Sequence, residues 1–451
     1  MAERLAIIGG DAAGMSAASQ ALRRDPDLEV VAFERGPYTS YSACGIPYFL
    51  AGDFDDPDRL IVRSPEKHRE RGIDVRIRQE VVHVDLGARQ LTVRDHAKRR
   101  ESTEPFDQLV IATGAVAVAP PVPGTDAVEP ARTVDAAERF DVQLRRGGEK
   151  AVVIGGGYIG IEMAEALVKR GMSVTLLELA DQVMNVALDK DMAAHVQEGA
   201  EAEGIDVRTA SPVTEIEHDA DGRPVAVHVE DEVFPADHVV LATGVKPAVE
   251  FAKEAGLETG DRGALIVDDH QRCPGHEGVF AAGDCVASFH RLLNKPVNVQ
   301  LGTHANKQGR IVGVNATGGD AAFPGVIGTA VTRICNREVG RTGLTEAECA
   351  EHRPDLDVVA AVAESKTRAG YLPEAGPIWV KLVVERSSGR LLGGQIVGVE
   401  GAAKRVDVLA AAIWMGMTVQ ELELLDLGYA PPVAPVYDPL LVAATATLKL
   451  L

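Results

Sequence analysis

The sequence predicts an α/β protein with two copies of a parallel-sheet unit and a further domain after them. Two sequence motifs, each of which occurs twice, predict this fold class. An apolar run, a glycine-rich turn and a helix of small residues, RLAIIGGDAAGMSAASQAL at 4–22, recur as AVVIGGGYIGIEMAEALVKRG at 151–171. Each copy closes with an apolar strand ending in Thr-Gly, FDQLVIATGA at 106–115 and ADHVVLATGV at 236–245. A chain of 451 residues has room for roughly three domains.

The first unit carries Gly9, Gly10 and Gly14 in its turn, with Asp11 where the fingerprint usually has glycine. The next apolar run, LEVVAFE, ends in Glu34, 25 positions after Gly9. Glycines at such a turn let backbone N–H groups approach a pyrophosphate, which the helix N-terminus also attracts. An acid about 20 positions further on receives ribose hydroxyls. We therefore predict a dinucleotide site, with the Asp11 side chain turned away from the pyrophosphate.

The second unit matches the same fingerprint fully through Gly155, Gly157 and Gly160, and SVTLLE ends in Glu178, 23 positions after Gly155. An acid at this position favours a free ribose 2′-hydroxyl. The following residues, 179–181, offer no base for a 2′-phosphate. The sequence therefore predicts NADH as the nucleotide of the second site, with NADPH possible.

A third short strand and glycine turn, GVFAAGDCV at 278–286, ends in Asp284. Its carboxylate is suited either to a polyol hydroxyl of a cofactor or to capping a helix N-terminus. Two dinucleotide sites in one chain imply electron transfer between a resident and a visiting cofactor. A flavin and a nicotinamide fit that logic.

Composition restricts the partners. The formal charge of −21 disfavours nucleic acid and acidic membrane surfaces. No apolar run approaches the roughly 20 residues that span a bilayer, and no cleavable leader pattern opens the chain. The cysteines, at 44, 273, 285, 335 and 349, are odd in number and scattered, which suits a reducing compartment. We therefore expect a cytoplasmic protein, with no metal and with Cys273 and His276 in a surface turn.

Cys44 lies in SYSACGIPYF at 40–49, just after the first unit. Phe49 stands where a second cysteine would complete an internal disulfide. Gly45-Ile46-Pro47 is typical of a helix start, whose dipole would stabilise a thiolate. The alternative is a buried structural cysteine.

These motifs resemble the two-dinucleotide-binding flavoprotein reductases, the pyridine nucleotide–disulfide oxidoreductase family, over essentially the whole chain. SYSACGIPYF, LLGGQIVG at 391–398 and the stretch AKRVDVLAAAIWMGMTVQELELLDLGYAPP at 403–432 resemble its single-cysteine branch. That branch contains coenzyme A-disulfide reductases, NADH oxidases and peroxidases, and persulfide reductases. The resemblance implies two Rossmann-like domains, for FAD and NAD(P), and a C-terminal α+β dimerisation domain.

The resemblance also implies site residues and boundaries. FAD would be held by Gly9, Gly10, Gly14, Glu34, Thr113, Gly114 and Asp284. The nicotinamide dinucleotide would be held by Gly155, Gly157, Gly160 and Glu178, with Glu162 near the nicotinamide. The FAD domain would comprise residues 1–147 and 268–325, the NAD(P)H domain 148–267 and the dimerisation domain 326–451.

By the same resemblance Cys44 is the catalytic residue, and Tyr429 of one subunit reaches the substrate site of the other in a homodimer. The alternative role for Tyr429 is an aromatic plug at the dimer interface. Four residues match positions that contact coenzyme A in the branch, namely Gln20, Arg23, Ser40 and Asn306. For Gln20 and Arg23 the alternative is a solvated helix face.

The substrate site departs from the branch at several positions, namely Ala43, Arg368, Leu372, Val433, Ala434 and Tyr437. No C-terminal segment resembles the His–Glu pair of the two-cysteine reductases. The predicted function is an FAD-dependent enzyme that moves electrons from NADH through flavin to Cys44 and reduces a small-molecule disulfide or persulfide related to coenzyme A disulfide. The alternatives are an NADH oxidase or peroxidase that works through a Cys44 sulfenate, and a redox-sensing flavoprotein that controls partner binding.

Overall fold

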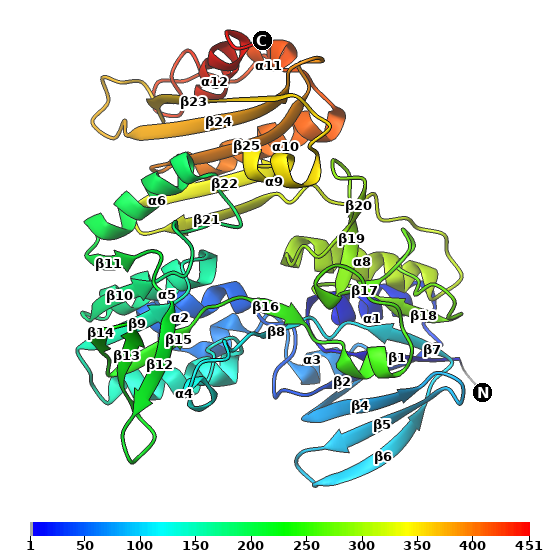
Figure 1. The fold of residues 1–451 in the computed structure, drawn as a ribbon. Coiled ribbons are helices and arrows are strands. Elements are labelled where there is room, and N and C mark those ends of the chain that lie inside the picture. Colours follow the sequence, from blue (N-terminus) through cyan, green and yellow to red (C-terminus); the bar gives the residue numbers. More distant parts are fainter. Residues whose placement is uncertain (1–2) are drawn as a thin grey trace.

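The computed structural model describes residues 3–451, which form two lower bodies and a C-terminal sheet domain that lies above them (Figure 1). The first body contains a parallel sheet of order β18-β7-β1-β2-β3. Its strands are β1 (Arg4–Ile8), β2 (Glu29–Glu34), β3 (Ile73–Ile77), β7 (Gln108–Ile111) and β18 (Val279–Ala281). Strand β18 therefore reaches this sheet from far along the chain.

The two faces of this sheet are covered by different elements. Leu5 and Ile7 pack with α1 (Ala12–Arg24) and α8 (Gly302–Asn315), whereas Ala6 and Ile8 pack toward the antiparallel sheet β4-β5-β6. This alternation is the two-residue period of a strand buried on both faces. The bounds of the antiparallel strands are β4 (Gln79–Asp85), β5 (Gln90–Asp95) and β6 (Arg100–Pro105).

Helices α1 and α8 approach closely because small residues line their contact. A Cβ at Gly309 would lie 2.2 Å from Ala13 O, and one at Gly313 would lie 2.5 Å from Ala17 O. The remaining elements of this body are α3 (Pro65–Arg69), β17 (Leu265–Ile266), β19 (Val286–His290) and β20 (Lys295–Val297). The segment between β2 and α3 holds the one-turn 3-10 helix η1 (Ala43–Gly45), α2 (Ile46–Ala51) and η2 (Pro57–Leu60), and its apolar side chains pack against the second body.

The second body repeats the plan with a parallel sheet of order β11-β10-β9-β15. Its elements are β9 (Lys150–Ile154), α5 (Tyr158–Lys169), β10 (Ser173–Leu177), α6 (Lys190–Ala202), β11 (Ile205–Arg208), β15 (His238–Leu241) and α4 (Val134–Arg145). A three-stranded sheet of β12 (Val213–His218), β13 (Pro224–Val229) and β14 (Glu232–Pro235) covers its other face. A two-stranded ribbon of β8 (Ala115–Ala117) and β16 (Val245–Pro247), followed in the chain by α7 (Glu250–Glu254), joins the two bodies.

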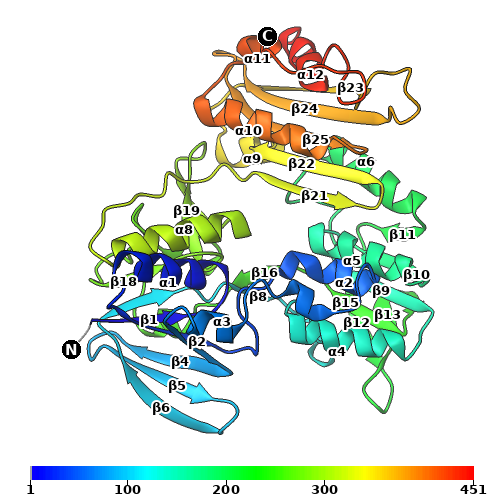
Figure 2. The ribbon, with the colours of Figure 1, turned by 180° about the vertical axis from the view of Figure 1, so that it is seen from behind.

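The C-terminal domain is an antiparallel sheet of order β21-β22-β25-β24-β23 with helices packed on it, and Figure 2 shows the same arrangement from behind. Its strands are β21 (Ala330–Ile334), β22 (Arg337–Gly343), β23 (Val358–Lys366), β24 (Pro377–Glu385) and β25 (Leu391–Gly398). Its helices are α9 (Glu346–His352), η5 (Ala403–Arg405), α10 (Val406–Met415), α11 (Val419–Glu423) and α12 (Pro439–Leu448). All of β25 is buried at the centre of the domain. Within residues 3–451, no helix is both long and apolar enough to cross a membrane.

Candidate active site

The first glycine turn, between β1 and α1, has a geometry that only glycine permits. Gly9 has φ +110°, and a Cβ there would lie 2.2 Å from Ala112 O; a Cβ at Gly14 would lie 2.0 Å from Gly9 O. Glu34, at the end of β2, accepts hydrogen bonds from Gly10 N at 2.8 Å and Gly36 N at 2.6 Å. The predicted acid is thereby held beside the turn.

The second turn, between β9 and α5, repeats this arrangement. Gly155 has φ +109°, and a Cβ at Gly160 would lie 1.8 Å from Gly155 O. Glu178 is buried and accepts hydrogen bonds from Gly156 N at 2.5 Å and Ala180 N at 2.7 Å. Gly157, the N-cap of α5, has no atom within 4 Å of the place where a Cβ would lie. The turn therefore leaves open space for a ligand.

Asp11 occupies the matching position of the first turn. Its Oδ1 accepts a hydrogen bond from Tyr41 N at 3.2 Å, so the carboxylate faces the segment that precedes Cys44. Burial raises the pKa of Asp11 to about 6, and the nearby carboxylates of Glu34 and Asp284 act in the same direction. Asp11 thus ties the first turn to the Cys44 segment.

Cys44 lies in η1, immediately before α2. It is exposed, whereas the other cysteines of the described chain are buried, and all five are free. The alternative of a buried structural cysteine is therefore wrong. Phe49 and Leu50 of α2 lie in the core, so the position of the absent second cysteine is filled by packing. The Cys44 thiol is therefore accessible to solvent and has no second cysteine with which to form an internal disulfide.

The charges around Cys44 oppose ionisation. Desolvation by the surrounding protein raises the pKa of the Cys44 thiol, although the side chain touches solvent, and the carboxylates of Glu162 and Asp284 raise it further. Arg132 acts in the opposite direction. The expected stabilisation of the thiolate by the helix start is thus smaller than the effects that raise the Cys44 pKa. Helix α2 spans only residues 46–51, and desolvation, together with the two carboxylates, raises the pKa despite the helix start.

Comparison with known proteins agrees with this geometry. The chain matches the family model described as pyridine nucleotide-disulphide oxidoreductase over residues 3–309, and that family's dimerisation domain over residues 329–439. The chain belongs to the pyridine nucleotide-disulphide oxidoreductase family. The predicted family and fold class are therefore confirmed.

Three relatives show the breadth of this family. The chain is 37% identical over 449 residues to an NAD(P)H coenzyme A polysulfide/persulfide reductase of Pyrococcus horikoshii, covering 98% of each chain. It is 35% identical over 450 residues to an NADH oxidase of Methanocaldococcus jannaschii, covering 99% of each. A solved NAD-dependent persulfide reductase of A. fulgidus superposes with a TM-score of 0.94 at 38% identity, covering 99% of this chain and 83% of that one.

The first body of this family member has features that fit FAD. The Oγ1 atom of Thr113 is buried and has no hydrogen-bond partner within the described chain. Gly114 has φ +63° and no atom within 4 Å of an added Cβ. Asp284 lies 3.9 Å from Arg132 at the end of the β18 turn, and burial raises its pKa. The alternative role of Asp284 as a helix N-cap is wrong, because strand β19 follows it at Val286.

The predicted substrate residues fall into separate groups within one chain. On α1, Arg23 Nη1 donates to Gln20 Oε1 at 2.9 Å, and Arg23 is exposed. On α8, Asn306 Oδ1 accepts from Ser16 Oγ at 2.9 Å, so Asn306 is linked to α1. These contacts bring Gln20, Arg23 and Asn306 onto the paired helices α1 and α8.

Tyr429 lies elsewhere, on an exposed loop of the C-terminal domain. Several other large apolar residues of this domain are exposed, namely Tyr371, Met415, Leu424, Val433, Val436 and Tyr437. Exposed aromatic and methionine side chains are enriched at subunit interfaces. Tyr429 is itself exposed, as both of its alternative roles require, whether it reaches a substrate site or plugs the dimer interface.

Sequence reasoning missed two residues of this oxidoreductase's site. Arg132 stands beside Asp284 and is the cation that favours the Cys44 thiolate. Thr332, on β21, donates a hydrogen bond to Glu162 Oε1 from the C-terminal domain. Arg132 directly precedes Thr133, the N-cap of α4, so the start of this helix could have been detected in the sequence. Thr332 has no such signal, because it meets Glu162 only through tertiary packing.

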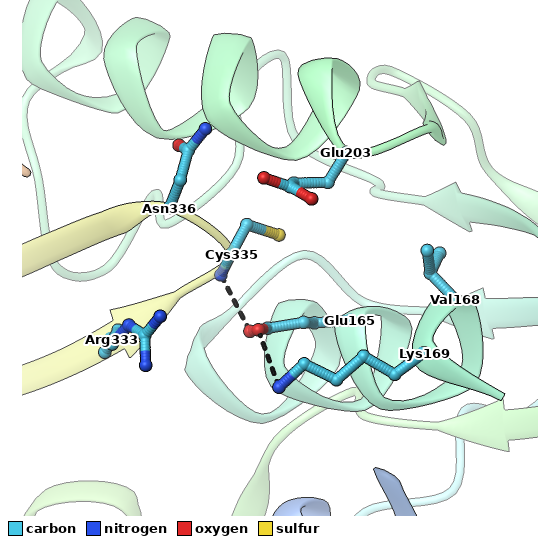
Figure 3. Close-up of a pocket in the computed structure, with 7 residues that line it drawn as sticks. All are labelled: Glu165, Val168, Lys169, Glu203, Arg333, Cys335 and Asn336. Carbon is cyan, nitrogen blue, oxygen red and sulfur yellow. Dashed lines mark hydrogen bonds and ion pairs between the residues drawn. The ribbon is translucent and has the colours of Figure 1, made fainter.

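A cavity of about 190 Å³ lies at the C-terminal end of α5, away from its glycine turn (Figure 3). It is lined by Glu165, Val168, Lys169, Glu203, Arg333, Cys335 and Asn336. Glu165 accepts from Cys335 N at 2.7 Å and pairs with Lys169 at 3.2 Å, as the dashed lines show. The contacts join α5 to the β21–β22 turn, so this cavity is a domain junction distinct from the glycine turns.

The electrostatics of the site give a first testable result. Glu162→Gln removes a negative charge that raises the pKa of Cys44, so the Cys44 pKa is expected to fall. The pH dependence of iodoacetamide alkylation of Cys44, followed by mass spectrometry, measures this pKa, because the other cysteines are buried. Glu165→Gln, one turn further along α5, is the matched control and leaves the midpoint unchanged. An unchanged or higher midpoint in Glu162→Gln would contradict the assignment.

Proposed function

We propose that this protein is an FAD-dependent oxidoreductase that takes electrons from NADH and reduces a small-molecule disulfide or persulfide of the coenzyme A type at Cys44. One observation carries the proposal. Cys44 is the only exposed cysteine within residues 3–451, and it stands beside a dinucleotide turn to which Asp11 ties its segment. The second sulfur of the redox pair therefore arrives with the substrate. The name of the Pyrococcus horikoshii relative supports the substrate class.

The chemistry at Cys44 is thiol–disulfide exchange. The Cys44 thiolate attacks one sulfur of the substrate, which forms a mixed disulfide and releases the other half as a thiolate. Arg132 favours the attacking anion, whereas Glu162 and Asp284 disfavour it. Bound FAD would supply the two electrons, taken from NADH as a hydride, that cleave the mixed disulfide. The full reaction converts NADH, a proton and one disulfide into NAD⁺ and two thiols.

The proposal assigns a role to each predicted site residue. FAD binding is assigned to the first turn and its neighbours, namely Gly9, Gly10, Gly14, Glu34, Thr113, Gly114 and Asp284. Nucleotide binding is assigned to the second turn, namely Gly155, Gly157, Gly160, Glu162 and Glu178. Substrate binding is assigned to Gln20, Arg23, Ser40 and Asn306. The orphaned Thr113 Oγ1 and the open space at Gly157 support the first two assignments.

The same proposal covers the organisation of the protein. The FAD domain comprises residues 1–147 and 268–325, the NAD(P)H domain 148–267 and the dimerisation domain 326–451. Pairing of β18 with β7 supports the discontinuous first domain. A homodimer, in which Tyr429 of each subunit reaches the other's site, is supported by the match to the dimerisation family. The free cysteines support a reducing compartment, the cytoplasm.

Glu178 gives the nucleotide preference. Its carboxylate, fixed by two backbone N–H groups, is placed for a ribose 2′-hydroxyl and repels a 2′-phosphate. We expect kcat/KM with NADH to exceed that with NADPH by about tenfold or more, since like-charge contact costs more than about 1.4 kcal/mol. Glu178→Gln reduces this ratio, whereas the control Asp181→Asn, at an exposed acid nearby, leaves it unchanged. Equal kcat/KM values in the wild type would show that Glu178 does not select NADH.

The decisive experiment is the intact mass of the protein as isolated, before and after mild reduction. Loss of a mass equal to coenzyme A from Cys44 supports the proposed substrate. Loss of one oxygen favours the alternative, an NADH oxidase or peroxidase working through a sulfenate, which the name of the Methanocaldococcus jannaschii relative supports. Stopped-flow mixing of the reduced enzyme with coenzyme A disulfide, O₂ and peroxide then ranks the oxidants by rate. Background rates with all of them, together with a change of partner affinity on adding NADH, would favour a redox sensor.

A further inference from the structure

Ser40, four residues before Cys44, has a backbone fixed on both sides. Its N–H donates to Gly10 O at 3.1 Å, and its carbonyl accepts from Val62 N at 2.8 Å. Its φ of +46° lies in the left-handed region, which serine rarely adopts. The backbone of Ser40 is therefore fixed, and the partner of its Oγ decides where the hydroxyl hydrogen points.

The partner of this hydroxyl is His68, on α3. His68 is fully buried, and its Nε2 lies 2.9 Å from Ser40 Oγ. Its other ring nitrogen, Nδ1, is buried and has no hydrogen-bond partner within residues 3–451. Burial lowers the pKa of His68 to about 4, and the cations Arg63 and Arg71 contribute, so the imidazole is neutral near pH 7.

A neutral imidazole carries one N–H, and the surroundings decide which nitrogen holds it. A proton on Nδ1 would bury an N–H with no acceptor, whereas a proton on Nε2 leaves only an unused lone pair there. Buried N–H groups without partners are rarer than unused acceptors. The Nε2–H tautomer is therefore favoured, and Ser40 Oγ accepts its hydrogen bond.

We propose that His68 is a positioning residue that donates its Nε2–H to Ser40 Oγ and thereby leaves the Ser40 hydroxyl hydrogen free to donate to the substrate. The inference rests on the proposed function, because it takes Ser40 as part of the substrate site. It also deepens that function: Ser40 selects a disulfide or persulfide whose non-sulfur part presents an acceptor, such as an amide carbonyl or a phosphate oxygen.

Neutron diffraction from deuterium-exchanged crystals of the holoenzyme tests the tautomer directly. A deuteron on Nε2 of His68, directed at Ser40 Oγ, is the expected result. A deuteron on Nδ1, or on both nitrogens, would overturn the proposal. This readout does not depend on turnover, so it stands even if no disulfide or persulfide proves to be a substrate.

Kinetics test the consequence. His68→Leu is expected to raise KM for coenzyme A disulfide about 5- to 10-fold, the worth of one neutral hydrogen bond, with little change in kcat. His68→Gln, which keeps an amide N–H donor, restores most of the loss. In a Ser40→Ala background, His68→Leu should add nothing further to KM. If His68→Leu raised KM in the Ser40→Ala background by the full 5- to 10-fold, His68 would not act through Ser40. An equal fall in kcat for His68→Leu and His68→Gln would likewise show that His68 acts only through folding.

Discussion

Cys44→Ser is expected to lower turnover with a disulfide substrate by about 10³-fold or more, while the protein still binds FAD and still oxidises NADH at its flavin. A serine hydroxyl is not ionised near pH 7 and does not form a mixed disulfide. The substitution changes one atom of an exposed side chain, so the fold and both glycine turns are retained. Stopped-flow absorbance separates NADH-driven flavin reduction from reoxidation by the disulfide.

Cys273→Ala is the matched control for this result. Cys273 is a free cysteine buried in the core of the first body, against the expectation of a surface turn, and it takes no part in the proposed exchange. This variant loses some stability and keeps its turnover. Undiminished disulfide turnover in Cys44→Ser would remove Cys44 from the mechanism, and with it the proposed function.

The two dinucleotide units were predictable because their determinants are local. Each needs a buried strand, glycines with left-handed or crowded backbone and an acid at the end of the next strand, all within about 30 residues. The structure realises both in the same way, with Glu34 and Glu178 each accepting hydrogen bonds from the glycine turn. The continuous apolar runs of these units are typical of parallel strands covered on both faces, and β1 is covered in this way.

The electrostatics of Cys44 were not predictable from its neighbours in sequence. A helix start nearby suggested a stabilised thiolate, but desolvation raises the thiol pKa, and so do the carboxylates of Glu162 on α5 and Asp284 after β18. Only tertiary packing brings these groups to the sulfur. The hydrogen bond between Ser40 and His68 was not predictable either. The match of Ser40 to a substrate-binding position gave no indication that His68 contacts its hydroxyl.

The C-terminal domain is joined to the second body by an ion cluster around two buried groups, Lys381 and Asp189, with two half-exposed acids, Asp191 and Glu346. Lys381, on β24, is 3% exposed, and its Nζ lies 3.2 Å from Asp189 and 2.8 Å from Asp191, with Glu346 also in contact. Asp189 also accepts from Gln395 Nε2 at 2.6 Å and from Glu346 N at 3.1 Å. Burial opposes ionisation of Asp189, yet these hydrogen bonds and the Lys381 ammonium hold its pKa below the usual value. The cluster therefore keeps its charges.

Lys381→Met is expected to destabilise the protein by about 3–5 kcal/mol, because it leaves the buried Asp189 carboxylate without its cation. The methionine side chain fills a similar volume, so the loss reports charge rather than a cavity. Thermal melting measures the loss, and hydrogen exchange locates it, with faster exchange expected at the start of α6 and in α9. The first body is not part of the cluster and should exchange at the wild-type rate.

Lys404→Met is the matched control, since Lys404 pairs with Asp407 in the same domain but both side chains are exposed. Its loss is expected to stay below about 1 kcal/mol, because water already solvates both charges. The comparison separates burial from charge removal as such. Equal melting temperatures for the two variants would mean that Lys381 does not hold the domains together. The contacts of α5 with β21 and with the β21–β22 turn would then be the stronger junction.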